Sequence, residues 1–248
     1  MKQDSCFINR FRYYTDLDDK DETLLLSLER SPERKCKGIT LWEEGDKTNE
    51  LYILSKGWAC SHRQLEDGSQ QIFEVFLPGD IIGLREFAFN KHLTSVVMLD
   101  EGVICPFPHR HLIDVFHESA VLSTIFLAIS SQHQALLTER LLNLAKRSAR
   151  QKIAHFFYEI FLRLQRFQSL PIHTFHVPLS QQQIGDYLGL SSVHVSRTFR
   201  EFREEGLILR ERQWIEFPDH EALACEAQFA TEYLTSDISH LMTQRVVV

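Results

Sequence analysis

The chain has 248 residues, of which 44% are hydrophobic and 25% are charged, a composition typical of a soluble globular protein with one large or two ordinary domains. No stretch approaches the ~20 uninterrupted apolar residues of a membrane-spanning helix, and the first six residues lack the apolar core of a secretory signal. The five cysteines have no short regular spacing, which argues against a disulfide scaffold. We therefore expect a cytoplasmic protein without a membrane partner.

The formal net charge of −7 is spread unevenly along the chain. Residues up to His133 include 14 basic and 21 acidic side chains, whereas residues 140–212 include 12 basic and 6 acidic ones. From Gln213 onward the chain has 1 basic and 6 acidic residues. A polyanion such as nucleic acid would therefore bind the third quarter of the chain, although a solvated helical face can produce the same excess.

Strand patterns alternate with turn residues between about residues 38 and 108. Residues 51–54, 58–63 and 71–77 have the apolar or mixed character of buried and half-buried strands, and Asp67-Gly68 before the last of them is typical of a tight hairpin. Short strands at this spacing predict a small antiparallel barrel or roll.

A helical pattern follows, from about residue 111 to residue 164. On its first, long helix, residues at steps of three and four form one stripe, which can belong to a hydrophobic core or to the seam of a dimer. We favour the seam, because a lone helix after a small barrel has little of its own domain to pack against. The stripe consists of Leu122, Ile125, Ile129, Gln132, Leu136 and Glu139.

The most informative pattern lies between residues 177 and 217. Ser180 is placed to cap one short helix, Gly189 to end it in a left-handed conformation, and Ser191 to cap a second helix. Two short helices joined by a tight turn form a helix-turn-helix unit, and the polar, basic second helix suits entry into the major groove. Two short runs around Leu209 and Trp214 predict a hairpin wing. The alternative is a helical hairpin that only packs against the rest of the protein and does not bind DNA.

In this arrangement the chain from about residue 15 to residue 220 resembles the Crp/Fnr superfamily of bacterial transcription regulators. The resemblance rests on residues 51–57 and 77–83, which look like the glycine turns of the family's roll, and on the winged helix-turn-helix. It implies an α+β fold with a homodimer on a near-palindromic DNA site and with RNA polymerase as a further partner. The implied parts are an N-terminal antiparallel, jelly-roll-like β-roll of the cyclic-nucleotide-binding type (1–110), a long dimerisation helix (111–146), a C-terminal winged helix-turn-helix (147–220) and a helical extension of unknown role (221–248).

The resemblance also implies DNA contacts by position. Arg197 matches the family's arginine that reads a guanine, and a bidentate fork on O6 and N7 is the commonest specific contact. Val193 stands where many members carry a glutamate, so we expect the half-site to depart from the usual TGA-type core at one position. The predicted DNA-binding set is Gln181, Ser191, Ser192, Val193, His194, Ser196, Arg197 and Arg200, with Lys146, Arg147 and Arg150 as further phosphate contacts.

The cyclic-AMP-binding members hold the phosphate with a glutamate and with an Arg-Ser or Arg-Thr pair. Leu84 and the pair Thr94-Ser95 stand at those positions here, and Arg85 and Glu86 lie one residue out of register. A phosphate pocket without its arginine loses a charge-assisted fork. We therefore expect the roll to sense a signal other than cyclic AMP, in a pocket around these five residues.

The sequence does not identify a cofactor. An iron–sulfur cubane requires four thiolates or equivalents, and the spacing of Cys6, Cys36, Cys60 and Cys105 matches no pattern of the iron–sulfur members, so buried structural thiols are favoured. Haem stays open, because Cys105 precedes a proline as in haem-regulatory dipeptides. A haem- or metal-based redox or gas sensor is therefore an alternative.

Histidines give the remaining candidates for metal or haem ligation. His62 and His92 lie on or near the predicted roll and are candidate axial ligands. His109 and His111 would share one face if they lay on a strand, where they could bind a metal, although solvated surface histidines fit equally well.

An enzyme is the competing functional class. We predict no catalytic residues, because the strand region lacks a His-x-His pair followed by Glu, and the chain has no phosphate-binding glycine loop and no nucleophile elbow. A passive nucleotide-binding module is the third class. The basic helix-turn-helix segment argues against both.

Overall fold

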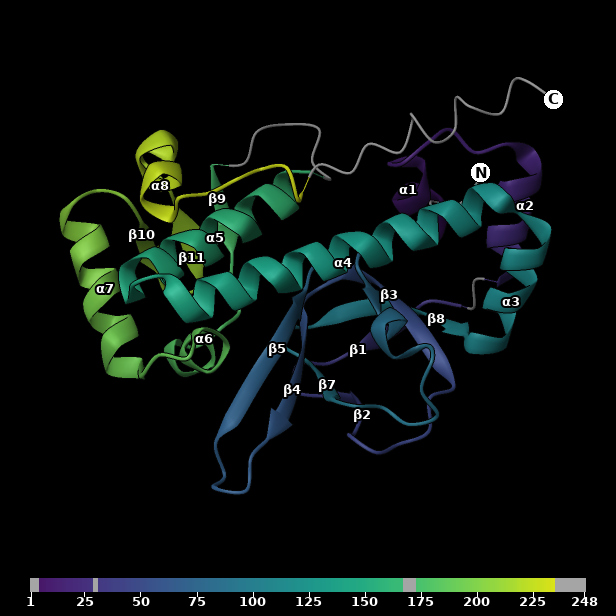
Figure 1. Ribbon diagram of the computed structural model, residues 1–248, viewed down its shortest axis with the longest axis horizontal. Helices are drawn as coiled ribbons and strands as arrows, with labels where there is room; N and C mark the ends of the chain where they lie inside the picture. Colours follow the sequence, from purple (N-terminus) through teal and green to yellow (C-terminus); the bar gives the residue numbers. More distant parts are fainter. Residues whose placement is uncertain (1–4, 29–30, 167–172, 235–248) are drawn as a thin grey trace. The chain divides into compact units, whose positions relative to one another are not determined.

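The computed structural model describes residues 5–28, 31–166 and 173–234 (Figure 1). It divides into two compact units. The first unit comprises residues 1–59, 76–136 and 232–248, and the second comprises residues 60–75 and 137–231. The long helix α4 therefore contributes residues to both units.

The first unit is built on antiparallel strands. One sheet has the strand order β1-β8-β3-β6, and its central pair is in a register that places Ile53 opposite Cys105. A second, short pair is formed by β2 and β7. The strands are β1 (Glu33–Lys35), β2 (Thr40–Trp42), β3 (Glu50–Lys56), β6 (Ile81–Ile82), β7 (Ser95–Met98) and β8 (Gly102–Pro108).

The remaining strands of the predicted roll, β4 (Ala59–Gln64) and β5 (Gln70–Phe76), form a hairpin whose residues 60–75 belong to the second unit. Its loop is closed by a hydrogen bond of 2.8 Å from the Leu65 amide to the Ser69 carbonyl, and Gly68 adopts a φ of 81°. This is the Asp67-Gly68 turn that the sequence predicts. The expected antiparallel architecture is confirmed.

Helices complete the first unit. The predicted long helix 111–146 is interrupted at Ser119, whose extended backbone ends α3 and whose Oγ accepts a hydrogen bond of 3.0 Å from the Leu122 amide in α4. The single-helix prediction is therefore wrong at this point. The helices of this unit are α1 (Cys6–Arg12), α2 (Asp19–Leu28), the 3-10 helix η1 (Leu84–Glu86), α3 (His109–Glu118) and the first part of α4 (Ala120–Lys146).

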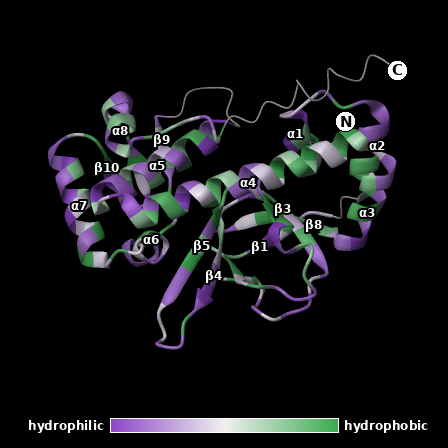
Figure 2. Cartoon of the chain, in the orientation of Figure 1, coloured by the Kyte–Doolittle hydropathy of each residue, from purple (hydrophilic) through white to green (hydrophobic). Residues whose placement is uncertain are grey.

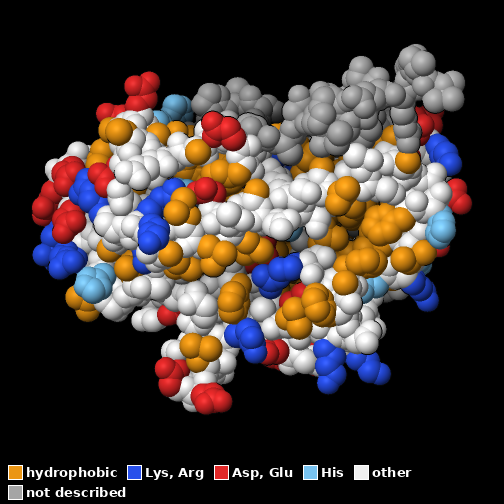
Figure 3. All heavy atoms as spheres, in the orientation of Figure 1, with side chains coloured by type: hydrophobic (Ala, Val, Ile, Leu, Met, Phe, Trp, Pro, Cys, Tyr) orange, Lys and Arg blue, Asp and Glu red, His pale blue; other side chains and the backbone are white. Residues whose placement is uncertain are grey.

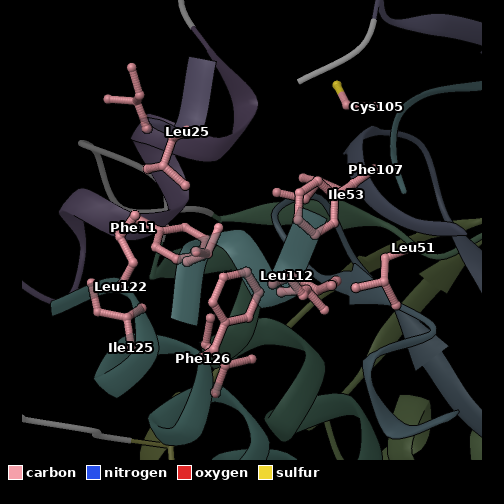
Figure 4. Packing of buried hydrophobic residues seen from close by; sticks show 14 of the residues in the cluster. Phe11, Leu25, Leu51, Ile53, Cys105, Phe107, Leu112, Leu122, Ile125 and Phe126 are labelled. Atoms are coloured by element: carbon pink, nitrogen blue, oxygen red, sulfur yellow. The ribbon is translucent and has the colours of Figure 1, made fainter. Parts of the chain in front are cut away.

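The stripe predicted as a dimer seam lies in the core of this unit. Leu122, Ile125 and Ile129 are fully buried and belong to one cluster with Phe11 of α1 and Phe107 of β8 (Figure 4). A side chain covered by its own chain cannot form a seam with a second copy. The seam prediction is thus corrected in favour of the core alternative, because α1, α2 and α3 supply packing partners that the strand pattern alone did not suggest.

The other residues of that stripe are engaged within their own units. Gln132 is buried, accepts a hydrogen bond of 3.3 Å from Tyr14 Oη and donates one of 2.7 Å to the Leu234 carbonyl. Leu136 is also buried, and the half-buried Glu139 accepts a hydrogen bond of 3.3 Å from Arg147. None of the six side chains is therefore left for a partner chain.

A different face of α4 is exposed. Leu127 and Leu141 are each 68% exposed, and Figure 3 shows hydrophobic side chains gathered over this helix. By length and mean hydropathy alone α4 would qualify as a membrane span. Its opposite face packs into the core described above, however, which is how a helix of a soluble protein is buried.

The second unit holds the predicted winged helix-turn-helix. Its helix α5 begins at a capping box in which Ser148 and Gln151 bond each other's backbone amides. A small antiparallel sheet has the order β10-β11-β9. The elements are α5 (Ala149–Gln165), β9 (Thr174–His176), α6 (Gln181–Leu188), α7 (Ser192–Glu204), β10 (Leu209–Glu211), β11 (Trp214–Glu216) and α8 (His220–Ala227).

The predicted C-terminal extension is helical only in part. Ala222 and Leu223 lie on α8, which packs against α5 and ends where Gln228 adopts a left-handed φ of 48°. Phe229 lies beyond the helix, with its ring centroid 5.2 Å from that of Tyr158. Tyr233 and Leu234 also follow the helix end, and residues 235–248 lie outside the described residues.

The burial of the α4 stripe gives a stability prediction. Ile125→Ala should lower the free energy of unfolding by about 2–5 kcal/mol, because it leaves a cavity in a packed core. Ile113→Ala, at a 49% exposed position on α3 in the same unit, is the matched control and should change it by less than about 0.5 kcal/mol. Urea unfolding measures both when Trp214 of the second unit is replaced by Phe, so that the fluorescence comes from Trp42 and Trp58, which share a unit with Ile125. Equally small effects would contradict the core assignment.

Candidate nucleic-acid interface

The helix-turn-helix is held by local capping. Ser180 and Gln183 form a capping box at the start of α6, with hydrogen bonds of 2.9 and 3.1 Å. Gly189 ends the helix at a φ of 63°, and Ser191 caps α7 by accepting a hydrogen bond of 3.3 Å from the His194 amide. The connection between the two helices is therefore the tight turn predicted from Ser180, Gly189 and Ser191.

Close packing between the two helices also requires Gly185. A Cβ at this position would lie 2.3 Å from the carbonyl oxygen of Leu190, so any side chain would displace the turn. On the buried side, the Phe199 ring of α7 lies 5.4 Å from Phe157 of α5. The buried face of α7 thus fixes which of its residues face outward.

The outward residues of α7 form a stripe at helical spacing, the recognition stripe: Val193, Ser196, Arg197 and Arg200. All four are exposed, and α7 as a whole is largely hydrophilic (Figure 2). The Arg197 side chain is 64% exposed and its Nε lies 3.8 Å from Glu201 Oε1, one turn further along. Four of the residues predicted to bind DNA therefore share one surface.

The other four predicted residues lie around this stripe. Ser191 and Ser192 open α7, and His194 is exposed with its Nδ1 3.1 Å from Ser191 Oγ. Gln181, the first residue of α6, borders a cavity of about 290 Å³ beside the recognition stripe.

That cavity is basic. Besides Gln181 it is lined by Ser196, Phe199, Arg200, Arg203 and Arg210. Arg210, on the first strand of the wing, donates a hydrogen bond of 2.9 Å to the Leu179 carbonyl and stacks on Phe199, but its buried Nη1 has no hydrogen-bond partner. Burial lowers the pKa of the Arg210 guanidinium. Three guanidinium groups bordering one cavity favour the binding of an anion there.

Arg203 and Arg210 are absent from the set predicted from sequence. Arg203 follows Arg200 by three residues on the same helix, so helical spacing alone could have identified it. Arg210 reaches the cavity only because β10 folds back beside α7, and no local sequence signal indicates this.

Two of the further phosphate contacts predicted from sequence are engaged elsewhere. The Arg147 side chain is 9% exposed and bonds Glu139, and Arg150 pairs with Glu205 at 2.8 Å and with Glu226 at 3.0 Å. The hydrogen bonds and ion pairs with Glu205 and Glu226 raise the pKa of Arg150 above its usual value. Arg147 and Arg150 therefore stabilise the fold of this unit, whereas Lys146 is exposed.

The predicted effector residues of the first unit bond one another. Glu86 is 2% exposed, lies 2.6 Å from His92 Nδ1 and accepts a hydrogen bond of 2.9 Å from Thr94 Oγ1. Burial alone would raise the pKa of Glu86, but the hydrogen bonds from His92 and Thr94 and the nearby charges hold it below its usual value. Arg85 lies 3.3 Å from Thr94 Oγ1. Arg85, Glu86 and Thr94 thus converge, with His92 as a partner not predicted for this role.

Leu84 and Ser95 are not part of this cluster. Leu84 packs against the hydrophobic core, and Ser95 Oγ donates a hydrogen bond of 2.8 Å to Glu43. A nearby cavity of about 480 Å³ is lined by none of the five predicted residues. Its lining is Leu41, Trp42, Asp46, Lys47, Asn49, Glu50, Tyr52 and His92.

The candidate metal ligands His92, His109 and His111 do not form one cluster. His92 is 4% exposed and stacked on Trp42 with centroids 4.0 Å apart, and His109 and His111 lie on helix α3, where residues two apart point in different directions. The same-face expectation for that pair is corrected, since it assumed a strand. Among the described residues, no group of three or more metal-ligating side chains could hold a metal ion.

The cysteines are similarly separate. Cys105 is fully buried in the core, and burial raises the pKa of the Cys60 thiol to about 12. Cys36 is exposed, and the side chain of Cys6 lies outside the described part of the chain.

Comparisons with known proteins match both units. A family model described as a cyclic nucleotide-binding domain matches residues 32–119, and one described as a Crp-like helix-turn-helix domain matches residues 151–226. The chain is 27% identical to the fumarate and nitrate reduction regulatory protein of Escherichia coli strain K12 over 188 residues, which are 76% of this chain and 75% of that protein.

Solved structures share the fold. FixK2 from Bradyrhizobium japonicum is similar with a TM-score of 0.73 at 21% identity, over 81% of this chain and 98% of that one. A CooA mutant from Carboxydothermus hydrogenoformans is similar with a TM-score of 0.67 at 17% identity, over 91% of this chain and 97% of that one. With its cyclic nucleotide-binding domain followed by a Crp-like helix-turn-helix domain, the chain belongs to the Crp/Fnr family of transcription regulators.

Proposed function

We propose that the protein is a homodimeric, sequence-specific DNA-binding regulator controlled by a signal sensed in its first unit. The observation that carries this proposal is the recognition stripe of α7 beside the basic cavity of Arg200, Arg203 and Arg210. A helix with polar and basic side chains on its free face fits the major groove, and a cluster of guanidinium groups fits the phosphates that border the groove.

The two kinds of contact have different roles in this proposal. Arg197, near the middle of the stripe, supplies a fork that can bind O6 and N7 of a guanine. Arg200, Arg203 and Arg210 line a cavity of about 290 Å³, which is large enough for a phosphate group. Phosphate contacts supply salt-dependent affinity and the base contact supplies specificity.

Arg197→Ala tests the base contact. We expect it to reduce the preference for operator over random DNA by about 10- to 100-fold per half-site, since one bidentate contact is lost, with little change in binding to random DNA. Fluorescence anisotropy at fixed salt with both DNAs measures this ratio. Arg110→Ala, an exposed arginine on α3 in the other unit, is the control. A variant of Arg197 that keeps its full preference would show that α7 does not read the site.

We propose that the dimer forms through the exposed face of α4. Its residues, the α4 seam, follow alternating steps of four and three, which is the spacing of a coiled-coil interface. Side chains on this face are apolar, small or uncharged, as helices in close contact require. The α4 seam consists of Leu127, Ser131, Gln134, Thr138, Leu141 and Ala145.

Leu141→Glu tests the seam. We expect a shift from dimer to monomer, because an unpaired carboxylate would face its own copy across a desolvated interface. Sedimentation velocity over a range of protein concentrations measures the change. Leu65→Glu, at the exposed loop of the β4–β5 hairpin, introduces the same charge and should leave the dimer intact. An unchanged dimer in Leu141→Glu, with circular dichroism confirming the fold, would contradict this seam.

We propose that the signal sensed by the first unit is not cyclic AMP. Leu84 has no polar side-chain atom at the position of the family's glutamate, and Glu86 and Thr94 are already bonded to each other and to neighbouring side chains. Cytoplasmic action and contact with RNA polymerase follow from the role of a transcription regulator and remain predictions.

Addition of cyclic AMP should leave the affinity for operator DNA unchanged. Anisotropy titrations with increasing cyclic AMP check this, with 5′-AMP as the control for ionic effects. A saturable rise in affinity with cyclic AMP alone would show that the first unit binds it despite the missing arginine.

A further inference from the structure

One residue of the recognition stripe is chemically unlike the others. Val193 is 74% exposed, more than any other exposed large hydrophobic residue in the described part of the chain. It lies in the first turn of α7, between Ser192 and His194. An isopropyl group this exposed packs little within its own unit, and it stands on the same face of α7 as Ser196 and Arg197.

The position of Val193 relative to Arg197 limits what its side chain can contact. Residues four apart on a helix share a face, and their Cα atoms are separated along the axis by about 6 Å. Successive base pairs are about 3.4 Å apart, so a helix lying along the groove would place Val193 about two base pairs from the guanine bound by Arg197. Both side chains would then meet base edges on the same floor of the groove.

We propose that Val193 reads a thymine through its C5-methyl group, in a position about two base pairs from the Arg197 guanine. This inference rests on the proposed function. Among the base edges in the major groove, thymine carries the C5-methyl group. Apolar side chains bind this methyl through van der Waals contact. The Val193 side chain has no atom that donates or accepts a hydrogen bond, so it distinguishes bases only through this methyl.

The neighbouring histidine does not replace this contact. His194 is held at the helix start, where its amide bonds Ser191 Oγ at 3.3 Å and its Nδ1 lies 3.1 Å from the same oxygen. Val193 instead precedes Ser196 and Arg197 by three and four residues, on their face of α7. The recognition stripe therefore presents an apolar contact and a guanidinium fork in a fixed order.

Removal of the methyl group from the DNA tests the proposal directly. The bound sequence is first selected from random DNA with the full-length protein. The thymine about two base pairs from the critical guanine is then replaced by deoxyuracil, which lacks only the C5-methyl. We expect an affinity loss of about fourfold for each half-site, the effect of one buried methyl group. In Val193→Ala the same replacement should change affinity by less than about twofold, because the contact is already reduced.

Two matched controls accompany this experiment. Deoxyuracil at a thymine in the spacer between half-sites controls for general changes in the DNA, and Leu65→Ala, at an exposed leucine on the β4–β5 loop, controls for loss of an apolar side chain. Val193→Glu should move the preference at this position toward a C·G pair, because a carboxylate accepts a hydrogen bond from cytosine N4.

The outcomes separate this inference from the function on which it rests. If a specific site is selected and wild type binds thymine and deoxyuracil equally well there, the methyl contact is overturned while the DNA-binding function stands. Equal sensitivity of wild type and Val193→Ala to deoxyuracil would assign the methyl contact to another residue and also overturn the inference. If no sequence is selected at all, the proposed function itself fails.

Discussion

The aromatic packing between α5 and the helix-turn-helix is the constraint on which the candidate interface depends. The Phe157 ring lies 5.4 Å from Phe199 of α7, and the Phe156 ring lies 4.7 Å from Tyr187 of α6. Each outward side chain of the recognition stripe owes its direction to these buried rings, because a helix with one face fixed has its opposite face fixed too. The direction of Arg197 is therefore set by residues on the buried side of α7.

The positive charge of the second unit is divided between structure and binding. Arg140 lies 3.8 Å and Arg163 lies 3.3 Å from the buried carboxylate of Glu159, and both donate hydrogen bonds to carbonyl oxygens of the β4–β5 hairpin. Removal of either arginine would take one of two cationic partners from this buried carboxylate, which costs stability. The arginines around the recognition stripe are mostly exposed instead. The excess of basic residues in this unit is therefore larger than the number of side chains available to bind phosphate.

The helix-turn-helix was predictable from sequence because its signals are local: the Ser180 cap, the Gly189 end and the Ser191 cap each act within a few residues. The α4 stripe was misassigned because helical periodicity indicates which residues are covered and not what covers them. The pairing of Glu86 with His92 and the approach of Arg210 to α7 depend on segments that meet only in the folded chain. Local sequence patterns do not predict such contacts between distant segments.

The most direct measurement of the central claim is a hydroxyl-radical footprint on a DNA sequence selected from a random pool by the full-length protein. The account predicts two protected half-sites of related, inverted sequence, with centres about one turn of the double helix apart, since two copies of α7 would enter successive major grooves. A selected pool without any common sequence, or a single protected half-site at saturating protein, would contradict it.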